Sequence, residues 1–190
     1  MSNRTALERV FDYAHRTVPG ALSDWEDHVA SWDDDYYTRY PNAQLSETHL
    51  EYAVFEFDHT NERVTLAYAL SVEQLMKRDV SRMRGFPNVN TGVQRVLGNK
   101  AFTADKGHFL GHASGGILDI NLFPQRRELN RGWSVEGKRF RSMERYVAEH
   151  SGTFFYHRPY YDDESWIPKK LEYGVLVDEV TWWVDSFQNK

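Results

Sequence analysis

The first part of the chain carries apolar residues at helical spacing. They recur about every third or fourth residue over residues 5–16, which predicts an amphipathic helix. A second helix is predicted over residues 23–32, because Ser23 is followed by Glu26 three residues later. Three consecutive aspartates at 33–35 and the Pro41-Asn42 pair predict a loop after the second helix.

Strand-like alternation begins near residue 49. Apolar and polar side chains alternate over residues 49–71 on both sides of a His-Thr-Asn-Glu turn at 59–62, which predicts a β-hairpin. A short helix is predicted over residues 72–84, with several basic side chains in its later half. A further strand is predicted over residues 92–102.

The second half combines strands with one well-marked helix. Residues 117–123 form a short apolar element, and residues 134–150 predict a helix that Ser134 caps and Ser151-Gly152 ends. Strands are predicted over residues 153–161 and 171–184. The order of elements indicates an α+β fold with a mainly antiparallel sheet and an N-terminal helical segment.

Size and composition fit one globular unit. The chain has 190 residues, of which 41% are hydrophobic, and it contains no cysteine, so disulfides and thiolate metal sites are excluded. We expect an acidic helical segment over residues 1–47 and the main domain over residues 48–190, in one continuous globular domain. The start lacks a basic end and an apolar run, so a cytoplasmic location is expected, although secretion without a cleaved leader would leave the same sequence.

Charge is distributed unevenly along the chain. The net charge is −5, but residues 1–75 hold 14 acidic and 5 basic residues, which leaves +4 on the remainder. Phosphate binding depends on where basic residues lie and not on the total. The second half therefore suits an anionic substrate. The acidic first part is either a solvated surface or a site for an inhibitor or regulatory partner.

Residues 105–136 hold the side chains needed to hydrolyse a phosphodiester. His108 follows Gly107 in an Asp-Lys-Gly-His turn, and an imidazole titrates near neutral pH, so it can accept a proton from water. Asn130 is a candidate ligand for Mg²⁺ or Mn²⁺, because such sites often have few protein ligands and keep several waters. Five arginines around these residues are candidate nucleic-acid contacts: Arg126, Arg127, Arg131, Arg139 and Arg141.

These residues resemble the motif of the DNA/RNA non-specific endonucleases, which belong to the ββα-metal or His-Me finger class. The matching elements are Asp105-Lys-Gly-His108, then Asn121-Leu-Phe-Pro-Gln125, then Leu129-Asn-Arg-Gly132 followed by Trp133. The resemblance covers residues 93–175. It implies a ββα-metal catalytic unit in which His108 is the general base, Asn130 holds the metal, Asn121 orients the site and Lys106 contacts the phosphate.

The spacing between Gly132 and Trp133 is shorter by one residue than in the family, and two further departures affect the proposed chemistry. The family's arginine is replaced by Lys106, which is less suited to bidentate phosphate contact. The glutamate that follows the metal ligand by eight residues in the family is replaced by Lys138, and Glu136 is the nearest candidate for its role near the metal. These departures keep open a nuclease fold that binds nucleic acid without cutting it. A toxin or defence effector controlled by a partner is compatible with either possibility.

Other residues leave the choice of substrate open. His108 and His112 have the spacing of zinc-binding helices, but the glycines around His112 disfavour a helix. The aromatic side chains of Trp133, Trp166 and Tyr160 are either base-stacking groups for single strands or core residues. Arg82, Arg84 and Arg95 are candidates for one further phosphate contact. No element resembles a major-groove reader, so we expect cleavage of DNA, with RNA as a second substrate class, and little sequence preference.

Overall fold

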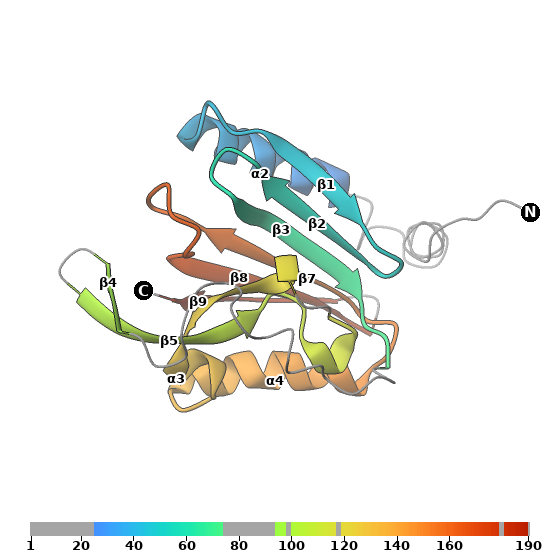
Figure 1. Ribbon diagram of the computed structural model, residues 1–190. Helices are drawn as coiled ribbons and strands as arrows, with labels where there is room; N and C mark the ends of the chain where they lie inside the picture. Colours follow the sequence, from blue (N-terminus) through green and yellow to red (C-terminus); the bar gives the residue numbers. More distant parts are fainter. Residues whose placement is uncertain (1–24, 74–93, 98–99, 117–118, 179–180, 190) are drawn as a thin grey trace, which may run out of the picture.

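Two antiparallel sheets organise the chain. The computed structural model describes residues 25–73, 94–97, 100–116, 119–178 and 181–189 (Figure 1). The predicted helix at 5–16 lies outside these residues, and so does nearly all of the helix predicted at 72–84.

The larger sheet has six strands in the order β1-β2-β3-β7-β8-β9, and each strand is antiparallel to its neighbours. Its strands are β1 (Leu45–His49), β2 (Ala53–Asp58), β3 (Arg63–Leu70), β7 (Phe154–Tyr160), β8 (Lys170–Val177) and β9 (Thr181–Gln188). The hairpin predicted over residues 49–71 is confirmed as β2 and β3. The segment 171–184 was predicted as one strand, which is wrong: it holds two paired strands that reverse after Asp178, a residue with φ 50°.

The smaller sheet has three strands in the order β4-β5-β6. They are β4 (Gln94–Leu97), β5 (Lys100–His108) and β6 (Leu122–Arg126), with the short 3-10 turns η1 (His112–Ser114) and η2 (Asp119–Asn121) between β5 and β6. Two helices follow directly, α3 (Arg127–Asn130) and α4 (Val135–Glu149). The predicted fold class, α+β with a mainly antiparallel sheet, is confirmed.

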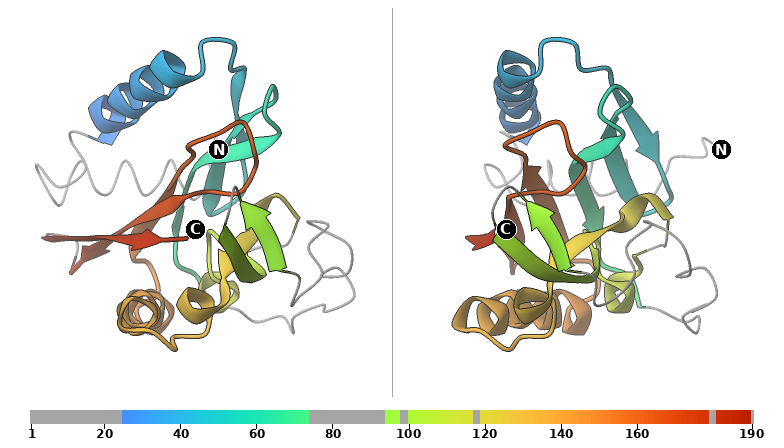
Figure 2. Two further views of the ribbon diagram at one scale, coloured as in Figure 1. Left: turned by 90° about the vertical axis from the view of Figure 1, so that its left-hand side faces the viewer. Right: turned by 60° about the vertical axis from the view of Figure 1, so that its left-hand side comes forward.

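Helices cover both faces of the larger sheet (Figures 1 and 2). On one face, α2 (Trp25–Arg39) packs through Trp25 against aromatic side chains of β3, β7 and β9. On the other face, α4 inserts Phe140, Met143 and Val147 into the main core, where Phe109, directly after β5, and Phe123 of β6 also lie. The smaller sheet and α4 therefore share one hydrophobic core with the larger sheet.

The start and end of α4 follow the prediction from sequence. The Ser134 hydroxyl accepts a hydrogen bond from the Gly137 backbone N–H at 2.9 Å, which caps the first turn. The helix ends at Glu149, just before Gly152, whose φ of 90° is in the left-handed region that glycine favours.

The loop predicted at Asp33–Asp35 is wrong, because α2 runs through it to Arg39. The aspartates are compatible with a helix here because two of them lie beside other groups. Asp33 is close enough to Glu56 on β2 for the two carboxyls to interact, and Asp35 pairs with Arg39 one turn later at 2.8 Å. Tyr36 secures the same turn by donating a hydrogen bond to Asp58 at 2.8 Å.

The predicted boundary between residues 47 and 48 falls inside β1, and α2 packs on the sheet of the following segment. The described part of the acidic segment thus joins the core of the main domain. Glu26, Asp27 and Asp34 of α2 are exposed, and a partner site there stays a prediction. None of the helices in the described ranges is long and apolar enough to cross a lipid bilayer.

Glu56 makes the stability of this packing dependent on pH. Its side chain is 5% exposed beneath α2, and burial, with the nearby charge of Asp33, raises its pKa to about 7. An acid whose pKa is raised on folding contributes stability below its unfolded pKa, and that stability is lost as pH rises through the folded pKa. We expect Glu56→Gln to be more stable than the wild type by on the order of 2 kcal/mol at about pH 8, with the difference shrinking toward pH 5.

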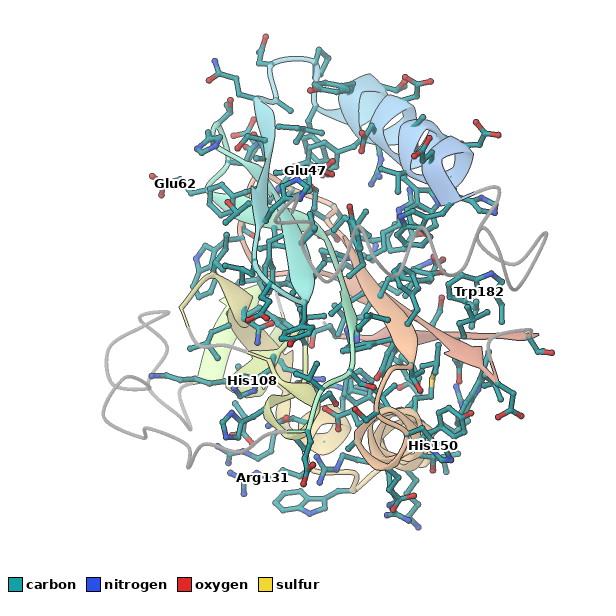
Figure 3. All side chains as sticks on the ribbon, turned by 90° about the vertical axis from the view of Figure 1, so that its right-hand side faces the viewer. Glu47, Glu62, His108, Arg131, His150 and Trp182 are labelled. Carbon is teal, nitrogen blue, oxygen red and sulfur yellow. The ribbon has the colours of Figure 1, made fainter. Side chains whose placement is uncertain are left out.

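Urea unfolding of both proteins across this pH range measures the effect. Glu62→Gln is the matched control, because Glu62 is an exposed turn residue that should leave the pH dependence unchanged (Figure 3). A wild-type pH profile in Glu56→Gln would show that another group controls the docking of α2.

Candidate active site

The predicted base lies at the end of a strand. His108 is the last residue of β5 and pairs with Leu122, while Lys106 pairs with Pro124 on β6. Because side chains alternate along a strand, His108 and Lys106 are on one face of β5 and Asp105 is on the other. Both His108 and Lys106 are partly exposed.

Gly107 lets β6 approach β5 closely. A Cβ atom at Gly107 would lie 2.4 Å from Oε1 and 2.5 Å from Cβ of Gln125, which is 1% exposed. A side chain at position 107 would therefore displace Gln125 from the interior. The turn predicted at Asp105–His108 is wrong, because β5 continues through these residues and Gly107 allows this close packing against Gln125 of β6.

Asn121 closes the turn that follows His108. Its side chain is fully buried, accepts a hydrogen bond from Leu110 N–H at 2.7 Å and donates one to Leu110 O at 2.8 Å. Its backbone carbonyl accepts a hydrogen bond from Phe109 N–H at 3.0 Å. The two residues after His108 are thus fixed by Asn121, an arrangement compatible with its predicted orienting role.

Asp105 joins β5 to α3. It is 4% exposed and accepts hydrogen bonds from Arg127 Nε at 3.0 Å and from Arg131 Nε at 2.6 Å. Burial alone would raise the pKa of Asp105, but the hydrogen bonds from Arg131 and Arg127 lower it below its usual value. The carboxylate is therefore ionised at neutral pH and is held by two guanidinium groups, an arrangement we call the Asp105 bridge.

The Asp105 bridge fixes Asn130 relative to the candidate base. Asn130 ends α3, between the two arginines that Asp105 binds, and His108 follows Asp105 by three residues on β5. Figure 3 shows His108 and Arg131 in the same lower part of the molecule. The Asn130 side chain is partly exposed and makes no hydrogen bond to the residues that the structure describes. Its amide oxygen is available to a ligand.

The carboxylate of Glu136, in the first turn of α4, is engaged in contacts that hold the fold together. Its Oε2 lies 2.5 Å from Arg126 Nη2, and its Oε1 accepts a hydrogen bond from the Gln188 backbone N–H at 3.0 Å. Burial would raise the pKa of Glu136, but the Gln188 N–H and Arg126 lower it. Both carboxylate oxygens thus have partners that connect α4 to β6 and β9. A metal-site role for Glu136 stays a prediction.

Every arginine of the predicted nucleic-acid surface pairs with a carboxylate. Arg126 binds Glu136, and the Asp105 bridge takes up Arg127 and Arg131. Farther along α4, Arg139 binds Asp185 at 2.7 Å and Arg141 binds Glu144 at 3.0 Å. Exposed pairs of this kind contribute about 0–1 kcal/mol, so phosphate can displace the carboxylate from Arg139 and Arg141, whose side chains are 48% and 56% exposed.

The other described histidines have different surroundings from His108. His112 begins the 3-10 turn η1 and His108 ends a strand, so the helix needed for a zinc site with that spacing does not form. No group of three or more His, Asp or Glu residues suited to hold a metal occurs within the described ranges. His157 is 2% exposed in the core, where burial lowers its pKa to about 3, and it is neutral at physiological pH.

Sequence reasoning missed the Asp105 bridge. The motif includes Asp105 without indicating a role for it, and the sequence predicts Arg127 and Arg131 as phosphate contacts. The available signal was the four-residue spacing of the two arginines, which places them on one side of a short helix. Among the candidates for an upstream phosphate contact, Arg82 and Arg84 lie outside the described residues and Arg95 belongs to β4.

Comparison with known proteins gives matches among solved structures. An extracellular endonuclease is 15% identical with a TM-score of 0.43, over 78% of this chain and 79% of that one. A chain of the EndoG/EndoGI complex is 14% identical with a TM-score of 0.43, over 76% of this chain and 74% of that one. An extracellular nuclease is 14% identical with a TM-score of 0.41, over 79% and 86% of the two chains.

The amino-acid sequence matches no family model and no curated protein.

Proposed function

We propose that this protein is a metal-dependent endonuclease that hydrolyses phosphodiester bonds of DNA, and of RNA as a second substrate, with little sequence specificity. One observation carries the proposal: the Asp105 bridge joins the strand that ends in His108 to the helix that ends in the free amide of Asn130. A candidate base and a candidate metal ligand are thereby held on one rigid unit.

His108 is the base in the proposed reaction. Its imidazole accepts a proton from a water molecule as the water oxygen attacks phosphorus in line with the 3′ oxygen. The bond from phosphorus to the 3′ oxygen breaks, and that oxygen takes up a proton, which leaves 3′-hydroxyl and 5′-phosphate ends. Asn121 keeps the backbone after His108 in place, and Lys106 on the same face of β5 contacts the phosphate.

Asn130 fits the requirement for a metal ligand. Its amide oxygen is partly exposed and unengaged in the described structure, whereas both oxygens of Glu136 already accept hydrogen bonds. A single amide ligand suits Mg²⁺ or Mn²⁺, which keep several waters when bound. When bound, the ion would neutralise charge on the scissile phosphate and on the leaving oxygen.

The experiment that tests this function is a grid of substrates and metals. Purified full-length protein is incubated with supercoiled plasmid, linear single-stranded DNA and RNA, each with Mg²⁺, Mn²⁺ or EDTA. We expect metal-dependent nicking and fragments that carry 5′-phosphate ends. The absence of cleavage with every substrate and metal would contradict the proposal, and so would cleavage that persists in EDTA.

Asn130→Ala is expected to raise the metal concentration for half-maximal cleavage by about tenfold or more, because it removes the proposed ligand. Asn130→Asp should retain metal dependence, since a carboxylate oxygen replaces the amide oxygen. Glu128→Gln is the matched control, because Glu128 is an exposed residue of the same short helix. Binding of Mn²⁺ followed by calorimetry gives a second readout, and unchanged binding in Asn130→Ala would show that the metal is held elsewhere.

A nucleic-acid-binding module without cleavage is the second candidate. The engagement of Glu136 by Arg126 and Gln188 favours it, because the nearest substitute for the family's glutamate is then unavailable to a metal site. This candidate predicts oligonucleotide binding that EDTA leaves unchanged, with no product under any metal. An inhibitor or regulatory partner at the acidic residues of α2 is compatible with both candidates.

A further inference from the structure

Trp133 is unusually exposed for a tryptophan. Its side chain is 62% exposed, whereas the other tryptophans in the described structure are buried or half-buried. Tryptophan is usually largely buried, because its ring contributes much apolar surface to a core. An open indole beside Asn130 in the chain is therefore a candidate contact for a ligand.

The indole is held in place before any ligand arrives. The Arg131 guanidinium carbon lies 5.0 Å from the centre of the Trp133 ring, and Arg131 is itself fixed by Asp105 at 2.6 Å. The backbone N–H of Trp133 donates a hydrogen bond to Glu128 O at 2.9 Å, and Gly132 makes the intervening turn with φ 71°. A group ordered in this way loses little conformational entropy on binding.

The other two aromatic candidates, Tyr160 and Trp166, have rings that are less open to a ligand. The Tyr160 ring has Lys170 Nζ 4.0 Å and the Arg158 guanidinium 4.5 Å from its centre, and its hydroxyl donates to Glu172 at 3.0 Å. Trp166 is only partly exposed and belongs to the loop between β7 and β8. Of the three, Trp133 presents the most open ring.

The chemistry of this pair indicates its ligand. A flat apolar ring with a guanidinium beside it suits a group that is aromatic and carries a nearby negative charge. A nucleobase joined to its phosphate has both properties, and base–aromatic stacking tolerates any base. Stacking on Trp133 requires a base that is free of its partner strand, because bases within a duplex already stack on each other.

We propose that Trp133, with Arg131 beside it, is a stacking site for an unpaired base of the substrate. The inference rests on the proposed function, since it takes nucleic acid as the ligand and Asn130 as the neighbouring metal ligand. The site directs the enzyme toward single strands and strand ends. It adds binding energy without sequence preference.

Binding without cleavage tests this site independently of catalysis. Full-length protein in EDTA is titrated into a fluorescent single-stranded DNA of mixed sequence, and anisotropy gives the dissociation constant. A second oligonucleotide has the same backbone with abasic positions in its centre. We expect Trp133→Ala to weaken binding of the base-bearing strand about tenfold and to leave the abasic strand unaffected.

The controls separate stacking from other causes. Val135→Ala removes a neighbouring apolar side chain that is 75% exposed, and it should bind both strands as the wild type does. Trp133→Phe should recover most of the affinity, because a smaller ring can still stack. An equal loss on both strands, no loss in Trp133→Ala, or no binding by the wild-type protein would each overturn the stacking site. Failure of cleavage alone would contradict the nuclease proposal and leave this result standing.

Discussion

His108→Ala is expected to lower the rate of plasmid cleavage by about 10³-fold while leaving the fold intact. The imidazole is the proposed proton acceptor. In the described segment from β5 to α3, the only other histidine is His112, which is also partly exposed. Because His108 ends a strand and is not buried, its removal creates no cavity in the core. Single-turnover cleavage together with the thermal unfolding midpoint measures both parts of the expectation.

His49→Ala serves as the matched control, because His49 is an exposed histidine on β1, where it pairs with Glu47. This variant should cleave at the wild-type rate. Because a general base acts in its deprotonated form, the wild-type rate should also rise with pH and then level off. Cleavage by His108→Ala at the wild-type rate would contradict the assignment of the base, and a large loss in His112→Ala would move it to that residue.

Asp105→Asn is expected to lower both stability and activity. The substitution leaves Arg127 and Arg131 without their shared carboxylate, and breaking a buried ion pair typically costs 3–5 kcal/mol. The two arginine side chains are 24% and 43% exposed, so water compensates in part and we expect a loss of about 2 kcal/mol. Because α3 is then less firmly tied to β5, we expect cleavage to fall by about 10²-fold.

Urea unfolding and single-turnover cleavage test the two effects separately. Asp185→Asn is the control, since it removes a carboxylate from an exposed pair with Arg139 and should cost less than about 1 kcal/mol. The lowered pKa of Asp105 makes its contribution to stability dependent on pH. Its stabilising contribution is present above the ordinary carboxyl pKa near 4 and is lost as pH falls toward the folded value. Full activity in a destabilised Asp105→Asn would show that the bridge serves folding alone.

The sequence predicted those elements whose signals are local. The hairpin at 49–71 follows from strict alternation around one turn, and α4 follows from its serine cap and its apolar face. The errors arose where distant partners override local preference. Asp33 faces Glu56 on β2, a neighbour that is invisible in a linear reading, whereas the pairing of Asp35 with Arg39 one turn later could have been read from their four-residue spacing.

In the candidate site, too, contacts between segments that are distant in the sequence could not be predicted. The sequence predicts Lys106 and His108 on a turn after a strand, whereas β5 runs on through both residues because Gly107 lets β6 pair closely with it. The carboxylate partners of the arginines could not be predicted from the sequence either, because Asp105 reaches Arg131 only after β5 and α3 come together. The exposure of Trp133 also depends on the complete fold, since an indole after a glycine turn could as readily have faced the core.

We propose that one unit of β5, β6 and α3 hydrolyses phosphodiesters with His108 as base and a metal held through Asn130. The most direct measurement is the initial rate of nicking of a supercoiled plasmid across a series of Mg²⁺ concentrations, with wild type and His108→Ala purified and assayed side by side. We predict a saturable, EDTA-sensitive rate for the wild type and a rate near background for His108→Ala. Equal rates for the two proteins, or none for a folded wild type that binds DNA, would contradict it.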